Sequence, residues 1–122
     1  MRAVKGTDTQ PEMMVRRLAH GMGYRFRLHR KDLPGTPDLV FPRLRRVVFV
    51  NGCFWHGHDC ARGARAPKAN ADYWSRKIAR NSLRDAANLT ALKAEGWRVA
   101  VIWECELKEP ARVKKRLARF LS

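Results

Sequence analysis

The chain has 122 residues, with 26 lysine or arginine residues against 11 aspartate or glutamate residues and a formal net charge of +15. This length predicts one domain over residues 1–122, with room for a single hydrophobic core. No run approaches the roughly 20 apolar residues of a membrane span, and the basic N-terminus has no apolar segment behind it, so we expect a cytoplasmic protein without a secretory signal.

The first predicted element is a helix. Thr9 and Glu12 have the spacing of a capping box, with Thr9 as the N-cap, and Gly21 or Gly23 ends the helix. Residues 24–29 alternate between apolar and basic side chains, which indicates a half-exposed strand.

Turn-forming residues at 32–37 then lead into two short apolar strands, residues 38–41 and 46–50. A tight turn at Pro42-Arg43 separates the two strands. Residues 52–71 contain too much glycine, proline and asparagine for regular structure.

The second half of the chain predicts a long helix over residues 72–95, a strand over 98–103 and a basic helix over 110–121. The long helix carries apolar residues that lie roughly on one face: Tyr73, Trp74, Ile78, Leu83, Leu89 and Leu92. The order is α-β-β-β-α-β-α. A helix between the third and fourth strands implies a right-handed parallel crossover, so we expect an α/β fold with a mixed central sheet flanked by helices.

The charge favours a polyanionic partner, because a small domain with this excess of cations carries a strong positive field. A basic solvated surface and adhesion to anionic lipid are the alternatives. The cations are spread along the whole chain, without the polybasic tail or amphipathic anchor that favours membranes. Nucleic acid is therefore the leading candidate, and we expect no membrane partner.

Residues 51–60 and Cys105 suggest a metal site. Cys53, Cys60 and Cys105 with one histidine form a Cys3His set suited to tetrahedral zinc, and a fully protein-ligated zinc is structural. The alternative is three buried thiols with surface histidines. The spacing leaves open whether His56 or His58 is the ligand.

A second set of residues suggests hydrolytic chemistry. Asp38 lies at the start of a strand, where a carboxylate can hold Mg²⁺. The capping-box role alone would explain a glutamate at position 12, without any part in catalysis. Together with His56, however, the two carboxylates supply the anchor and the base that Mg²⁺-assisted phosphodiester cleavage needs.

The aromatic residues have two interpretations. Phe54, Trp55 and Trp74 can belong to the core or insert between base steps of DNA. Helical periodicity alone favours a core position for Trp74 and does not decide for Phe54 and Trp55.

The chain resembles the Vsr-type very-short-patch repair endonucleases, which have the restriction-endonuclease-like fold. The motifs that carry the resemblance occur in the family's order and cover nearly the whole chain: residues 9–12, 33–38, 48–60, 73–74, 96–99 and 103–105. Gly-Cys-Phe-Trp-His at 52–56, with Trp-Glu-Cys at 103–105, is a highly specific combination. The resemblance implies a Mg²⁺-dependent nick of one strand, 5′ to the thymine of a T:G mismatch left by 5-methylcytosine deamination.

The resemblance also implies roles for individual residues. Asp38 and the backbone carbonyl of Val50 hold Mg²⁺, His56 activates the water, and Glu12 supports them. The structural zinc ligands are Cys53, His58, Cys60 and Cys105. The implied contacts with double-stranded DNA, by intercalation for the aromatic residues, come from Phe54, Trp55, Trp74, Lys77 and Asn81.

Two departures from the family pattern affect these expectations. Asn51 stands where the family has a second histidine near the scissile phosphate, and asparagine cannot carry a proton at neutral pH. We expect activity to survive, with a slower nick or a different pH profile. The chain also begins at the methionine that ends a DNA-clasping N-terminal arm in the family. That arm is therefore missing or not included in this sequence, and we expect weaker affinity or mismatch selectivity without it.

Two other functions fit parts of the sequence: a non-catalytic, zinc-stabilised DNA-binding module, and a restriction-associated nuclease without mismatch preference. The joint presence of Glu12, Asp38 and His56 argues against a pure binding module. We expect a monomer in the bacterial nucleoid, with mismatch-repair proteins as further candidate partners.

Overall fold

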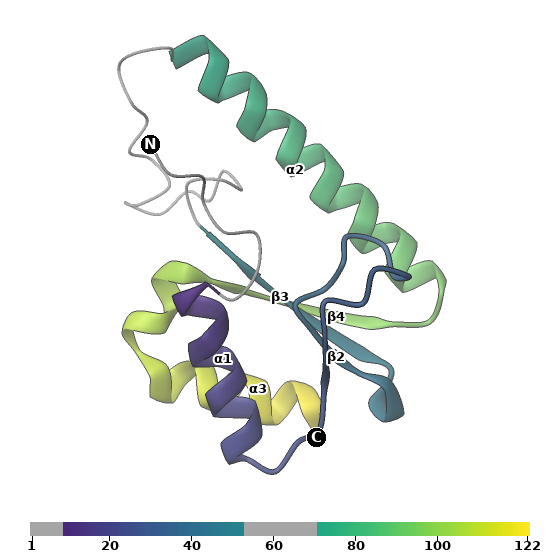
Figure 1. The fold of residues 1–122 in the computed structure, drawn as a ribbon, viewed down its shortest axis with the longest axis vertical. Coiled ribbons are helices and arrows are strands. Elements are labelled where there is room, and N and C mark those ends of the chain that lie inside the picture. The colour runs from purple at the N-terminus through teal and green to yellow at the C-terminus, as the bar shows by residue number, and fades with distance from the viewer. Residues whose placement is uncertain (1–8, 53–70) are drawn as a thin grey trace.

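A computed structural model describes residues 9–52 and 71–122 (Figure 1). Four strands form one sheet in the order β1-β2-β3-β4. Strand β1 (Arg27–Leu28) pairs antiparallel with β2 (Leu39–Phe41), which pairs antiparallel with β3 (Arg46–Asn51). Strand β3 pairs in parallel with β4 (Arg98–Trp103). The predicted mixed sheet is confirmed.

Helices cover both faces of this sheet, as predicted (Figure 1). Helices α1 (Gln10–Gly21) and α3 (Pro110–Leu121) pack on one face, and α2 (Ala71–Ala94) lies on the other. No helix within the described ranges is long and apolar enough to cross a bilayer.

Each face of the sheet has its own buried cluster because neighbouring strand residues point to opposite sides. On β3, Val48 packs with residues of α1 and α3, whereas Val47 packs with Leu92 of α2 and with Trp97. Strand β3 is apolar on both faces for this reason, as expected of a strand covered on both sides.

Two local predictions were wrong. The strand predicted over residues 24–29 forms a ladder of only two residues, although Tyr24 and Phe26 still pack edge-on against Phe41. Tyr73 and Leu83 do not share the inward face of α2, because they are 53% and 73% exposed. Leu83 lies nine residues before the buried Leu92, which at about 100° per residue places the two on opposite sides of the helix.

Candidate active site

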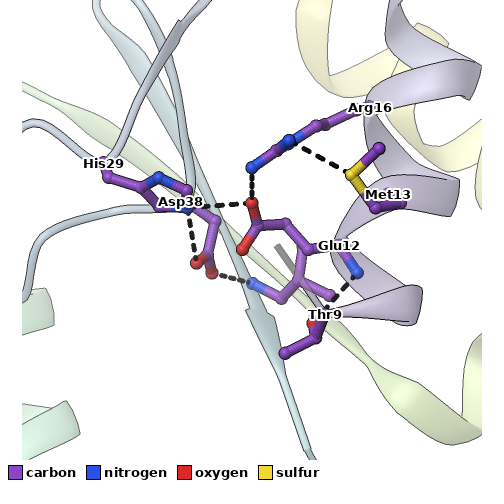
Figure 2. A network of polar contacts seen from close by, with 7 residues as sticks. Thr9, Glu12, Met13, Arg16, His29 and Asp38 are labelled. Carbon is purple, nitrogen blue, oxygen red and sulfur yellow. Dashed lines mark hydrogen bonds and ion pairs between the residues drawn. The ribbon is translucent and has the colours of Figure 1, made fainter. Parts of the chain in front are cut away.

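Three ionisable side chains from separate parts of the chain meet at one end of the sheet (Figure 2). They are Glu12 of α1, His29 directly after β1, and Asp38 directly before β2. His29 Nε2 lies 2.8 Å from Glu12 Oε2 and 3.9 Å from Asp38 Oδ1. One ligand atom from each residue falls within 4.8 Å of the other two. We call this group the acidic–histidine cluster.

The first turn of α1 positions Glu12. Thr9 is the N-cap, as predicted, and its hydroxyl oxygen accepts a hydrogen bond from the Glu12 backbone N–H at 3.4 Å. The Glu12 carboxylate contacts Arg16 and His29 rather than returning to Thr9. Only one half of the predicted capping box therefore forms between these residues, since the buried carboxylate is bound elsewhere.

The β1–β2 pair brings His29 and Asp38 together. The two residues are adjacent in the antiparallel register, and the His29 backbone N–H donates to the Asp38 carbonyl at 3.4 Å. His29 has a left-handed backbone with φ of 48°, an uncommon conformation for a residue other than glycine. Asp38 Oδ2 accepts a 2.7 Å hydrogen bond from the Val50 N–H, which ties the carboxylate to β3.

The surroundings of Asp38 raise its pKa from 3.8 to about 7. Burial is the largest cause, and the neighbouring Glu12 carboxylate also raises the pKa, whereas the Val50 N–H and His29 lower it. Two carboxylates in a site of low polarity disfavour a second negative charge. A divalent cation relieves this repulsion, and carboxylate oxygens are the donors that Mg²⁺ prefers. The residues present therefore fit a divalent metal site.

Asn51 lies apart from the acidic–histidine cluster. Its side chain is buried and lines a cavity of about 230 Å³ between the sheet and α2, together with Asp85, Asn88 and Trp103. None of the three cluster residues lines this cavity. Val50, by contrast, reaches Asp38 through its backbone N–H. The predicted metal contact of the Val50 carbonyl stays a prediction.

The predicted zinc set is only partly within the described residues. Cys105 is half-buried in the 3-10 segment Glu104–Lys108, two residues after Trp103. Trp103 pairs with Asn51, so the chain leaves β3 and β4 at the same edge of the sheet. Cys53, His58 and Cys60 lie outside the described residues, as do Phe54, Trp55 and His56.

Three residues predicted to contact DNA lie within the described part of the chain, and all three belong to the N-terminal half of α2. Trp74 is half-buried and belongs to neither buried cluster, and Asn81 is also half-buried. The ammonium of Lys77 lies 6.0 Å from the centre of the Trp74 ring and 5.9 Å from that of Tyr73. Within the described residues Trp74 therefore does not join the core that periodicity favours for it, and its contact with DNA stays a prediction.

Sequence reasoning missed His29 and Arg16 as members of the site. His29 ends the predicted strand 24–29 and Asp38 starts the next one. Pairing these two strands as an antiparallel hairpin would have placed both residues at the same end. Arg16 lies one helical turn after Glu12, a spacing that brings opposite charges together.

Comparisons with known proteins agree with the family resemblance seen in the sequence. Residues 1–62 match the family model described as DNA mismatch endonuclease Vsr. The type II nicking enzyme V.XorIIP of Xanthomonas oryzae pv. oryzae is 57% identical over 121 residues, which cover 99% of this chain and 88% of the relative. The type II nicking enzyme V.NmeAIP of Neisseria meningitidis serogroup A is 42% identical, covering 99% and 86%. The DNA mismatch endonuclease Vsr of Escherichia coli K12 is 40% identical over 108 residues, covering 88% and 69%.

Proposed function

The chain belongs to the Vsr family of DNA mismatch endonucleases and is a DNA endonuclease, and from this premise we propose that it nicks one strand 5′ to the thymine of a T:G mismatch. The proposed reaction depends on Mg²⁺. Relatives named nicking enzymes support a cut in one strand, and the relative named a mismatch endonuclease supports the mismatch as the target.

The observation that carries the catalytic part of the proposal is the acidic–histidine cluster. Asp38 and the Val50 backbone carbonyl are the groups that would hold Mg²⁺. Glu12 would support them, because its carboxylate converges with that of Asp38 at the end of the sheet. When bound there, Mg²⁺ supplies Lewis-acid polarisation of the scissile phosphate. The Val50 N–H fixes one oxygen of Asp38 at 2.7 Å, which leaves the other oxygen, Oδ1, facing His29.

The remaining roles are part of the same proposal. His56 would accept the proton of the attacking water, and Cys53, His58, Cys60 and Cys105 would hold a structural zinc. The parallel β3–β4 pair supports the zinc site, because it brings Cys105 to the edge where the segment with the other three ligands begins. The Lys77 ammonium beside Trp74 supports a DNA-facing role for this part of α2, since lysine contributes charge and tryptophan stacking.

The experiment that tests this function maps the cut. End-labelled duplexes that differ only in one T:G or T:A pair are incubated with the protein, with and without Mg²⁺. We expect one nick, 5′ to the mismatched thymine, that requires Mg²⁺. Equal cutting of the T:A duplex would instead indicate a nuclease without mismatch preference, and binding without any cut would indicate a DNA-binding module.

A further inference from the structure

The imidazole of His29 is the least expected member of the acidic–histidine cluster. Mg²⁺ sites are usually built from oxygen donors, whereas imidazole nitrogen suits transition metals. Here the Nε2 atom points between the two carboxylates, at 2.8 Å from Glu12 and 3.9 Å from Asp38 (Figure 2). In the metal-free cluster the 2.8 Å contact is a hydrogen bond, so a cation that takes Nε2 as a ligand would displace the proton shared with Glu12, either to Nδ1 or to solvent. A nitrogen donor therefore becomes available where a cation would be held.

We propose that His29 is a direct ligand of the catalytic divalent cation, through Nε2, and that it makes this site bind Mn²⁺ more tightly than Mg²⁺. The inference deepens the proposed function and rests on it, since it concerns the metal that Asp38 holds. Mn²⁺ is a transition-metal ion and accepts imidazole nitrogen more readily than Mg²⁺, so an imidazole ligand should strengthen Mn²⁺ binding more than Mg²⁺ binding.

The distances suit such a site. Around a six-coordinate ion with bonds of about 2.1 Å, adjacent ligand atoms are separated by about 3 Å and opposite ones by about 4 Å. The separations of His29 Nε2 from Glu12 and Asp38, 2.8 Å and 3.9 Å, are close to these two values. The three ligand atoms come from three different parts of the chain, which fixes their relative positions.

The backbone holds His29 in this orientation at some cost. A left-handed φ of 48° is unfavourable for a residue with a Cβ atom. The hydrogen bond from its N–H to the Asp38 carbonyl ties this backbone to the start of β2. Arg16 contacts the same Glu12 oxygen as His29 and partly compensates the charge of that carboxylate. The negative charge available to a bound cation therefore comes chiefly from Asp38.

The decisive experiment is pulsed electron paramagnetic resonance of Mn²⁺ bound to the protein, which detects nitrogen nuclei coupled directly to the metal. We expect a histidine ¹⁴N coupling in the parent chain that is lost in His29→Gln. The matched control is His20→Gln, because His20 is exposed in the last turn of α1 and should leave the coupling unchanged. A coupling that persists in His29→Gln overturns the proposal, as does its absence from the parent chain.

Calorimetric titration with Mn²⁺ and Mg²⁺ supplies the second readout. We expect His29→Gln to weaken Mn²⁺ binding by about 10-fold or more and Mg²⁺ binding much less. Equal weakening of both metals would indicate a merely structural role. A second variant, His29→Asn, replaces His29→Gln if circular dichroism shows that the latter is unfolded. If the parent chain nicks no duplex with either metal, the proposed function fails, while the coupling and the titrations still decide on His29.

Discussion

Replacement of Asp38 by asparagine tests the electrostatics of the site most simply. The pKa of Asp38 is raised from 3.8 to about 7, with burial as the largest cause. The folded protein therefore favours the protonated carboxyl. The stability associated with this proton is complete below the unfolded pKa of 3.8 and is lost as the pH rises through the folded pKa of about 7.

The magnitude follows from the shift. Since one pKa unit corresponds to about 1.4 kcal/mol, the ionised carboxylate destabilises the fold by up to about 4 kcal/mol above pH 7. At about pH 5 the same reasoning gives about 2 kcal/mol. Asparagine is neutral at every pH, and its side-chain oxygen can still accept the hydrogen bond from the Val50 N–H. Asp38→Asn should therefore be more stable than the parent chain, by a margin that grows between these pH values.

Urea unfolding of both chains at about pH 5 and about pH 8 measures this margin. The control is Asp32→Asn, because Asp32 is 61% exposed and hydrogen bonding to Arg30 lowers its pKa. The gain in stability of Asp32→Asn over the parent chain should not grow between these two pH values. Added Mg²⁺ should narrow the margin at the higher pH, since only the parent chain keeps the carboxylate. A margin that is zero at both pH values would refute the view that Asp38 is an electrostatically strained carboxylate.

Three further predictions concern other parts of the molecule. Gly35→Ala should lower the free energy of unfolding by about 1 kcal/mol or more, because Gly35 has φ of +77° and an added Cβ would lie 2.8 Å from the Asn88 side chain. Urea denaturation measures this loss, and adding Asn88→Ala should restore part of it. Trp74→Ala should weaken binding to a T:G duplex by about 10-fold, whereas Leu83→Ala, on the exposed side of α2, should not; equal effects in a fluorescence titration would contradict the assignment. Asn51→His should raise the single-turnover nicking rate by about 10-fold if proton transfer at this position limits it, and an unchanged rate would show that it does not.

Local patterns were sufficient to predict most of the fold. The alternation of apolar residues, the Thr9 N-cap and the turn-forming residues at 32–37 predicted strands and helices close to those observed, because short-range sterics and one-sided burial determine these elements. The length of β1 could not be predicted in this way. It depends on where the chain enters and leaves the sheet: the Tyr24 N–H donates to the Ala19 carbonyl of α1, before the ladder begins, and the left-handed His29 follows its last residue.

The candidate site was predicted less completely than the fold. Asp38 and Glu12 were singled out, and the structure brings them together. His29 carried no motif, because its role arises from a contact with Glu12 across 17 residues of sequence. The exposure of Leu83 is a different case, because helical geometry alone would have separated it from the buried side of α2.

The central claim is that Asp38 anchors the metal-dependent cleavage of DNA. It is tested most directly by the single-turnover rate of nicking of a T:G duplex in Mg²⁺, measured for the parent chain, Asp38→Asn and the exposed control Asp32→Asn. Loss of the metal's stabilisation of the transition state should slow Asp38→Asn by about 100-fold or more and leave Asp32→Asn close to the parent rate. Nicking by Asp38→Asn at the parent rate, with the same dependence on Mg²⁺, would contradict the account.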